Sequence, residues 1–111
     1  MTKTSLVSRH CVPCKGGTPP LSLNQTNSLL KSVPKWSAMG NQQIDREFEF
    51  KNFVAATGFI TQVALIAQRE NHHPDIYLHQ WNKIKITLTT HAIGGLSEND
   101  FILAAKIDQL T

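Results

Sequence analysis

Two stretches of this chain alternate apolar and polar residues, which is the period of a β-strand that buries one face. The first covers residues 43–51 and the second covers residues 84–89. Between them, apolar residues recur at helical spacing from Phe53 to Glu70, and Asn52 before them is a favourable N-cap. This stripe consists of Phe53, Ala56, Ile60, Val63, Ala64 and Ala67. Half-buried strands on either side of a long helix predict a sheet with helices packed on its apolar face.

The segments before and after this central pattern predict two more helices. Ser22 or Asn24 caps a first helix, which Pro34 ends. Near the other end of the chain, Ser97 and Asp100 resemble a capping box, with Asp in place of the usual Glu. Both segments carry apolar residues at helical spacing, so each helix has a face to bury against the sheet.

Two more strands are expected beside the alternating ones. Trp36 follows the first helix and is expected to be a core residue where the sheet begins. Residues 76–81 are expected to pair with residues 84–89. The resulting order, α-β-β-α-β-β-α, predicts an α+β fold in which one four-stranded antiparallel sheet is covered on one face by three helices.

The length and composition of the chain indicate one folded domain. A single core of ordinary size accounts for 111 residues, and a hydrophobic content of 41% suits a globular protein. We expect residues 1–20 to form an irregular arm and residues 21–111 to form the domain. The long helix is apolar nearly all around, which predicts that a partner subunit covers its outer side in a homodimer or homotetramer.

Charge and hydropathy restrict the possible partners. The net charge is only +3, and the Lys and Arg residues are scattered, so nucleic-acid binding gains little support. The first residues lack the apolar segment of a secretory signal, and no apolar run is long enough to cross a bilayer. We therefore expect a cytoplasmic protein without membrane association.

Cys11 and Cys14 form one CxxC motif beside His10. A redox site of the thioredoxin kind needs this motif at a helix N-terminus after a strand, whereas a Gly- and Pro-rich tract follows here. A structural zinc site needs two ligands beyond the cysteines, and His10 supplies at most one of them. The motif is therefore interpreted as part of an exposed, reduced arm.

Four of the five histidines lie within residues 69–91. His72 and His73 follow the long helix, and His91 follows the last strand. If the hairpin turns near Asn82, His73 and His91 are equally far from the turn and come opposite each other. His91 shares a strand face with Thr and Lys residues, so its ring is expected to be accessible. The three imidazoles are therefore predicted to converge.

Three interpretations of such a cluster remain open from the spacing alone. Three imidazoles can bind a metal ion that activates water, although adjacent histidines rarely point to one place and no HExxH motif accompanies them. Imidazoles also donate and accept protons near neutral pH, because their unperturbed pKa is about 6.5. The third interpretation is that they are surface residues of a loop and a helix end.

The spacing of residues around the histidines resembles the signature of the pterin-4a-carbinolamine dehydratases. The matching residues are Gln68, His72, His73, Pro74, Trp81, His91 and Asp100. The segment Thr-His-Ala-Ile-Gly-Gly-Leu-Ser, which begins at Thr90, resembles a second segment of that family. The resemblance covers most of residues 21–110, and it implies a four-stranded sheet with three helices, assembled as dimers or tetramers.

The resemblance also implies a reaction. Members of this family dehydrate 4a-hydroxytetrahydropterin, which aromatic amino acid hydroxylases such as phenylalanine hydroxylase release, to quinonoid dihydropterin and water. An acid must protonate the departing oxygen while a base takes a proton from a ring nitrogen. No metal and no other cofactor is required. The alternative function is that of a non-catalytic interaction module, because some animal relatives bind a homeodomain transcription factor and stabilise its dimers.

The resemblance assigns roles to individual residues. His72 and His91 would be the catalytic acid and base, and His73 would chiefly hold and orient the pterin. The residues expected to complete the substrate site are Asn71, Thr90, Trp81 and Asp100. For Trp81, stacking on the pterin and packing within the protein are both open. For Asp100, a simpler role is to stabilise the first turn of the last helix.

Overall fold

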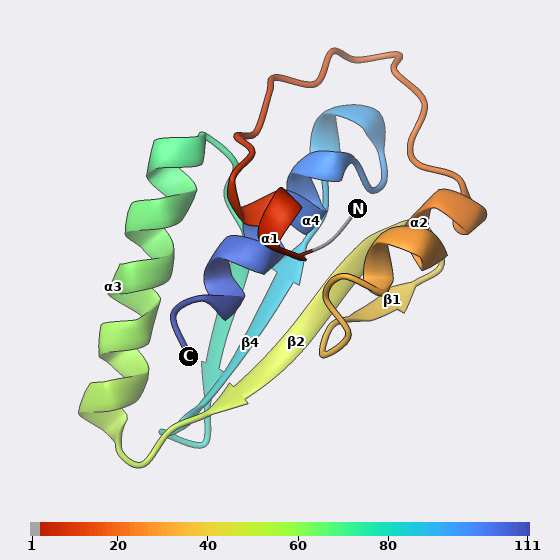
Figure 1. The fold of residues 1–111 in the computed structure, drawn as a ribbon. Helices are drawn as coiled ribbons and strands as arrows, with labels where there is room; N and C mark the ends of the chain where they lie inside the picture. The colour runs from red at the N-terminus through yellow and green to blue at the C-terminus, as the bar shows by residue number, and fades with distance from the viewer. Residues whose placement is uncertain (1–2) are drawn as a thin grey trace.

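The computed structural model describes residues 3–111, with side chains from Ser5 onward. The helices are α1 (Lys3–Val7), α2 (Leu23–Leu30), α3 (Phe53–Glu70) and α4 (Glu98–Asp108), with a short 3-10 helix, η1 (His91–Ile93). The strands are β1 (Ser37–Met39), β2 (Gln43–Glu49), β3 (Asp75–His79) and β4 (Lys83–Leu88). Apart from α1 and η1, these elements follow the predicted order (Figure 1).

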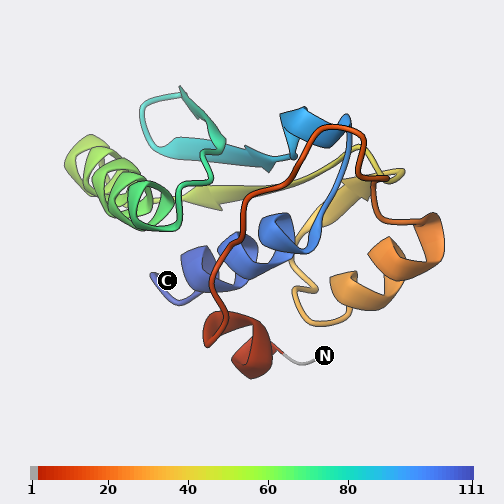
Figure 2. The same ribbon diagram turned by 90° about the horizontal axis from the view of Figure 1, so that it is seen from above.

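The strands form one antiparallel sheet in the order β1-β2-β4-β3. Helices α2, α3 and α4 lie on one side of it, and the opposite face of the sheet is left largely uncovered (Figure 2). The apolar side chains of β2 and β4 point toward the helices and are almost completely buried, as their alternation predicts. The predicted α+β fold is therefore confirmed.

The hairpin of β3 and β4 turns one residue earlier than predicted. His79 pairs with Lys83, which centres the turn on Trp81. Trp81 adopts a positive φ of 57°, a conformation that tight turns between antiparallel strands favour. The predicted pairing of His73 with His91 is wrong, because both residues lie beyond the last paired residues of the hairpin.

Side-chain caps set the beginnings of the three larger helices. Asn52 accepts a backbone N–H from the first turn of α3 at 2.8 Å. Ser22 and Gln25 form a capping box at α2, and Ser97 and Asp100 form one at α4. These caps satisfy backbone N–H groups that have no partner inside the helix, so the local sequence is sufficient to place the helix starts.

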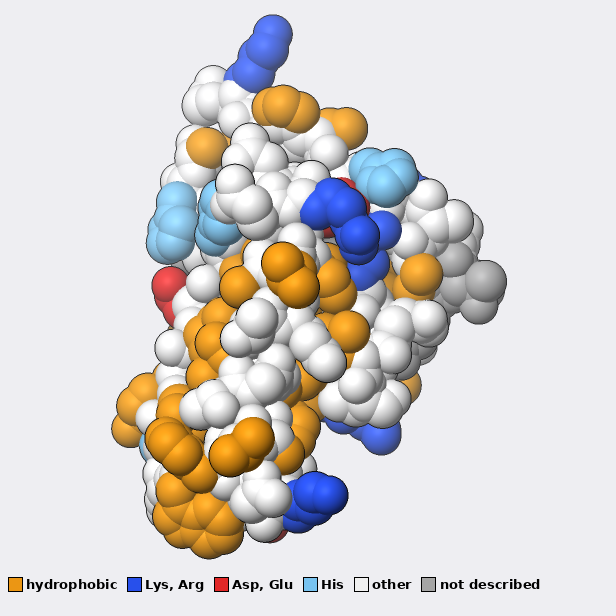
Figure 3. All heavy atoms as spheres, turned by 90° about the vertical axis from the view of Figure 1, so that its left-hand side faces the viewer, with side chains coloured by type: hydrophobic (Ala, Val, Ile, Leu, Met, Phe, Trp, Pro, Cys, Tyr) orange, Lys and Arg blue, Asp and Glu red, His pale blue; other side chains and the backbone are white. Residues whose placement is uncertain are grey.

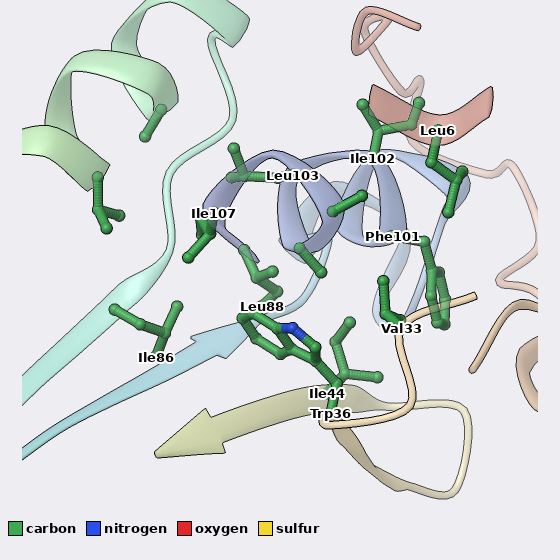
Figure 4. Packing of buried hydrophobic residues seen from close by; sticks show 14 of the residues in the cluster. Leu6, Val33, Trp36, Ile44, Ile86, Leu88, Phe101, Ile102, Leu103 and Ile107 are labelled. Atoms are coloured by element: carbon green, nitrogen blue, oxygen red, sulfur yellow. The ribbon is translucent and has the colours of Figure 1, made fainter. Parts of the chain in front are cut away.

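Helix α4 lies in the middle of the molecule, between the sheet and α1 (Figure 4). Phe101, Ile102, Leu103 and Ile107 are each at most 1% exposed, although they point in different directions. On the side away from the sheet, the fully buried Leu6 of α1 covers α4. The prediction of an irregular arm is therefore wrong for residues 3–7, which form a helix that belongs to the core.

Helix α3 buries a somewhat different stripe from the predicted one. The buried apolar residues of the helix are Ala56, Phe59, Val63 and Ala67. Phe59 packs against Phe48 of β2, with ring centroids 4.7 Å apart. Phe53 and Ala64, which were predicted to face the core, are exposed. The aromatic contact with the sheet orients the helix, and periodicity alone does not distinguish between two apolar sides.

The outer side of α3 exposes large apolar side chains. Val54 is 77% exposed, Leu65 is 68% exposed and Phe53 is 53% exposed. Figure 3 shows apolar side chains gathered over this face of the molecule. This is the surface that the sequence predicts a partner subunit to cover. Among the described helices, none combines the length and the apolar character needed to cross a membrane.

Candidate functional site

A pocket of about 270 Å³ opens near the C-terminal ends of α3 and β4. Its walls are residues 71–73 after α3, residues 89–92 after β4, residues 12–14 of the N-terminal arm, and Asn99 of α4. Its volume lies just below the range of roughly 300–1,000 Å³ that is usual for drug-sized ligands, so the pocket suits a small molecule.

The three histidines reach this pocket from two directions. Asn71 ends α3 in the left-handed conformation, with φ 52° and ψ 40°, which Asn tolerates better than most residues. This turn of the backbone directs His72 and His73 away from the helix and into the pocket wall. His91 comes from a different segment, as the first residue of η1 beyond the end of β4.

A buried carboxylate holds one of the three imidazoles. The Nε2 of His72 lies 2.6 Å from Oδ1 of Asp100, and the side chain of His72 is 12% exposed. Because an ionised carboxylate only accepts hydrogen bonds, Nε2 of His72 carries the hydrogen. In a neutral ring this leaves Nδ1 unprotonated, so Nδ1 is the nitrogen that can accept a proton.

Asp100 itself has no exposed surface and lies behind the pocket. Its Oδ2 accepts the hydroxyl of Thr90 at 2.8 Å and the backbone N–H of Ser97 at 3.0 Å. Asp100 is not among the residues that line the pocket, so the structure gives no support to a direct contact between its carboxylate and a substrate. Its carboxylate caps α4 and orients His72 at the same time.

Asn71 and Thr90, which were predicted to belong to the substrate site, both line the pocket. Asn71 is exposed, so its amide is accessible to a ligand. Thr90 is 5% exposed, and its hydroxyl is already bonded to Asp100 and to Oγ of Ser97, each at 2.8 Å. Thr90 therefore shapes the wall and supports Asp100, and its hydroxyl is not free for a substrate.

The other two histidines of the pocket are exposed. The Nε2 of His73 lies 3.0 Å from Oε1 of Gln68, one turn back on α3. His91 lines the pocket and is exposed to solvent. The pocket therefore contains one imidazole that a buried carboxylate holds and two imidazoles that are exposed to solvent.

Trp81 lies far from this pocket. It is 60% exposed in the turn between β3 and β4, at the end of the hairpin opposite to the histidines. The length of β4 separates the two places, which is on the order of 20 Å. The interpretation of Trp81 as a packing residue is therefore wrong, and Trp81 is not among the residues that line this pocket.

Sequence reasoning missed the wall that the N-terminal arm contributes. Cys11 and Cys14 are partly buried, and Val12 and Pro13 stand beside the histidines, so these residues are not a detached arm. It also missed Asn99, which is 5% exposed. The CxxC motif was the only local signal at the arm, and neither its redox nor its zinc interpretation indicates such a contact.

Within residues 3–111, no three His, Cys, Asp or Glu side chains are grouped so that they would hold a metal ion. Two of the imidazoles have other partners, since His72 bonds to Asp100 and His73 bonds to Gln68. The geometry of the described residues therefore gives no support to the metal-site interpretation, and it suits proton transfer.

Glu70 links the arm to the last turn of α3. Its buried carboxylate accepts the N–H of Cys11 at 2.8 Å, lies 3.0 Å from Nδ1 of His10 and lies 3.6 Å from Nζ of Lys106. Burial by itself raises the pKa of Glu70, but these three partners outweigh burial and hold the pKa below its usual value. Burial, together with the charges of Glu70 and Asp100, raises the pKa of the Cys11 thiol to about 12.

Glu70→Gln is expected to make the stability of the protein less sensitive to acid. The folded-state pKa of Glu70 lies below its ordinary value of 4.5, so its stabilising contribution is complete above that pH and is lost as the pH falls through the folded pKa. The unfolding free energy of the wild type should therefore fall more steeply below about pH 4.5 than that of the variant. Urea unfolding at a series of pH values measures this difference.

Glu47→Gln is the matched control. Glu47 lies on the uncovered face of the sheet, about half exposed, 3.0 Å from His79. Its replacement should leave the dependence of stability on acid pH close to that of the wild type. Equal slopes for the wild type and Glu70→Gln would contradict the role given to Glu70.

The fold and the pocket together define an α+β protein with a histidine-lined site for a small ligand. A family model described as pterin 4 alpha carbinolamine dehydratase matches residues 19–110. The chain therefore belongs to the pterin-4a-carbinolamine dehydratase family.

Several curated relatives extend the similarity over nearly the whole chain. A protein of Nitrosospira multiformis, provisionally named pterin-4-alpha-carbinolamine dehydratase, is 48% identical over 109 residues, which is 98% of this chain and 95% of that protein. A protein of Rubrobacter xylanophilus with the same provisional name is 42% identical and covers 96% of this chain and 99% of its own length.

Two solved structures share the fold. One is a transcriptional coactivator/pterin dehydratase from Brucella melitensis, with a TM-score of 0.75 and 34% identity over 81% of this chain and 96% of that chain. The other is a pterin dehydratase-like RuBisCO assembly factor of the alpha-carboxysome, with a TM-score of 0.59 and 23% identity over 68% of this chain and 88% of that chain. The second similarity shows the fold alone.

Proposed function

We propose that this protein dehydrates 4a-hydroxytetrahydropterin to quinonoid dihydropterin and water. In this reaction the carbon–oxygen bond at C4a breaks, the departing hydroxyl gains a proton to become water, and a ring nitrogen loses a proton. The observation that carries the proposal is the placement of His72, held by a buried carboxylate, in the same pocket as the exposed His91. The family and the names of the relatives support the choice of substrate.

His72 is the base in this proposal. Asp100 accepts the hydrogen on Nε2, so Nδ1 of the neutral ring takes the proton from the pterin nitrogen. The imidazolium that forms lies 2.6 Å from a buried carboxylate, which stabilises the positive charge where water is scarce. Asp100 does not touch the substrate and is a positioning residue.

His91 is the acid. It lines the same pocket as His72 but belongs to the segment after β4, and in this proposal the bound ring system lies between the two imidazoles. Protonated His91 gives its proton to the departing hydroxyl, and its exposure to solvent lets it take up another proton after each turnover. His73 and Asn71 hold and orient the pterin through hydrogen bonds at the rim.

Turnover by the purified wild-type protein tests the proposal directly. Freshly generated 4a-hydroxytetrahydropterin is mixed with the protein in a stopped-flow instrument, and the appearance of quinonoid dihydropterin is followed by absorbance. The expected result is a rate that rises in proportion to protein concentration above the protein-free reaction. A rate equal to the protein-free reaction would refute the proposal.

We also propose that the protein needs no metal or other cofactor, that it acts in the cytoplasm, and that an aromatic amino acid hydroxylase such as phenylalanine hydroxylase supplies its substrate. If no metal is needed, the protein should keep its full turnover after dialysis against a chelator. Elemental analysis of the dialysed protein checks that metal has been removed. Loss of turnover that a divalent metal restores would overturn the statement that no metal is needed.

We also propose that copies of this chain associate through the outer side of α3. Exposed Val54 and Leu65 lie on this side, and a monomer would leave their apolar surface in water. Sedimentation at micromolar concentration is expected to show dimers or tetramers, and Val54→Glu with Leu65→Glu should shift them to monomers. Met39→Glu, at an apolar residue of β1 that is 63% exposed, is the control. A monomeric wild type would contradict the proposal.

The alternative function, a non-catalytic interaction module, uses the same outer side of α3. The name of the Brucella melitensis protein combines a coactivator with a dehydratase, so the two functions are compatible in this fold. The stopped-flow measurement separates them, because an interaction module without catalysis would not accelerate dehydration.

A further inference from the structure

We propose that residues 12–14 of the N-terminal arm are a substrate-binding wall of the histidine pocket, and that Asn99 is the residue that positions this wall. The inference rests on the proposed function for the identity of the ligand, and it assigns a binding role to a segment outside residues 19–110, which the family model matches. The arm acts on binding, whereas His72 and His91 act on the chemical step.

Asn99 holds the arm from both sides of one residue. Its Oδ1 accepts the backbone N–H of Val12 at 3.0 Å, and its Nδ2 donates to the backbone carbonyl of Val12 at 2.6 Å. Both groups of the amide are used, and the residue is 5% exposed. Because one side chain bonds to both the N–H and the carbonyl of Val12, it fixes the position and the orientation of the arm.

Glu70 provides a second anchor, one residue earlier in the arm. Its carboxylate accepts the N–H of Cys11 at 2.8 Å, and its side chain is 1% exposed. The pocket wall formed by residues 12–14 therefore begins directly after a backbone group that is held in place. A segment with two such anchors loses little further conformational entropy when a ligand binds against it.

The two anchors tie the arm to the same helix ends that carry the proposed base and its partner. Asn99 immediately precedes Asp100 at the start of α4, and Glu70 is the last residue of α3, two residues before His72. The distance between the arm and the His72–Asp100 pair is therefore fixed by the backbone of these helix ends. A ligand that rests against the arm is placed at a defined position relative to His72.

The chemistry of the arm complements the other walls of the pocket. Val12 is 66% exposed and Pro13 is also exposed, and both line the pocket, so the arm adds apolar residues to a lining that otherwise consists of imidazoles, threonines, amides and Ala92. A planar heterocycle binds well between apolar walls that carry a few polar groups, because its faces are apolar and its edges form hydrogen bonds. We infer that the arm contacts a face or a substituent of the pterin ring.

Asn99→Ala is expected to raise KM about tenfold while kcat changes by less than about twofold. Losing the two bonds to Val12 releases the arm, and interactions that substrate and transition state share affect KM alone. Val12→Gly, which removes the apolar side chain and leaves Asn99 in place, should change KM in the same direction. Stopped-flow kinetics with 4a-hydroxytetrahydropterin over a range of concentrations measures both constants.

Asn82→Ala is the matched control. Nδ2 of Asn82 donates to the carbonyl of Phe50 at 3.0 Å, a bond of the same kind at the far end of the β3–β4 hairpin. This variant should lose a similar side-chain-to-backbone bond without any change in KM. Thermal unfolding of the three variants checks that each is folded at the assay temperature.

Alkylation of Cys14 gives a second measurement that does not depend on turnover. Cys14 lines the pocket, whereas the pKa of Cys11 is raised to about 12, so iodoacetamide near neutral pH should modify Cys14 first. A stable 7,8-dihydropterin should slow this modification in the wild type. In Asn99→Ala without ligand, the modification should be faster than in the wild type, because the arm is released. Peptide mass spectrometry follows both thiols.

The outcomes separate this inference from the proposed function. Protection of Cys14 by the dihydropterin without dehydration would keep the arm as a binding wall and refute the dehydratase activity. Dehydration by the wild type with unchanged KM in both Asn99→Ala and Val12→Gly would refute the role of the arm and keep the activity. A fall in kcat at unchanged KM in Asn99→Ala would also overturn the inference, because it would place the effect on Asp100 and His72. Failure of the dihydropterin to protect Cys14 would count against the arm as a wall.

Discussion

His91→Ala and His72→Ala are each expected to slow the dehydration of 4a-hydroxytetrahydropterin by about 10²- to 10⁴-fold, the range that a positioned general acid or base contributes. His91 is exposed, so its replacement should leave the unfolding free energy almost unchanged. His72→Ala should also destabilise the protein by about 1–3 kcal/mol, because it leaves the buried carboxylate of Asp100 without one of its donors. Stopped-flow kinetics and urea unfolding measure the two effects.

His79→Ala is the control for the loss of an imidazole. His79 stacks on Tyr77 and contacts Glu47 on the uncovered face of the sheet, outside the pocket. Its replacement should leave the dehydration rate within about twofold of the wild type. The double variant of His72 and His91 should be little slower than either single variant, since both residues act in one step. Wild-type rates in both single variants would defeat the assignment.

Asp100→Asn is expected to reduce kcat by about 10²-fold or more, although Asp100 does not touch the substrate. The amide of Asn has a similar shape, but its NH₂ group can donate to Nε2 of His72 and favour the tautomer with the hydrogen on Nδ1. That tautomer cannot accept a proton at Nδ1. An aspartate beside a catalytic histidine has this role in the serine proteases, where the same replacement lowers kcat by about 10⁴-fold.

Nitrogen NMR of the His72 ring distinguishes this effect from general damage to the fold. In the wild type the hydrogen should reside on Nε2, and in Asp100→Asn a substantial share should reside on Nδ1. Thr90→Val serves as the comparison, because it removes a hydrogen bond to Asp100 while the carboxylate keeps its contact with His72. That variant should keep the wild-type tautomer and most of kcat. An unchanged tautomer and unchanged kcat in Asp100→Asn would contradict the positioning role.

Much of the fold could be predicted because its signals are local. The caps at Ser22, Asn52 and Ser97 depend on residues within one helical turn, and the structure places all three as N-caps. The buried faces of β2 and β4 follow from strict alternation along each strand. The predicted turn of the β3–β4 hairpin was one residue too late, which shifts the strand pairing by two residues, since Gln80 and Trp81 adopt positive φ without a Gly to mark the turn.

The candidate site could also be predicted only in part from the sequence. The positions of His72, His73 and His91 beside a helix end and a strand end were sufficient to predict that they meet, although the predicted pairing within the hairpin was not correct. Asp100 and Trp81 were both included as substrate residues, but one is buried behind the pocket and the other lies at the far end of the hairpin. Periodicity indicates which face of an element is buried, and it does not indicate which distant residue lies against it.

The sequence by itself determined the α+β class, the order of the main elements, the helix caps and the set of imidazoles, because short segments encode these features through periodicity, capping and turn chemistry. Only the tertiary structure decided that Asp100 bonds to His72, 28 residues away in the sequence, and that Asn99 bonds to Val12, 87 residues away. Such contacts depend on how α4, the end of α3 and the N-terminal arm pack around one core. The packing of the whole chain, and no segment alone, therefore completes the pocket.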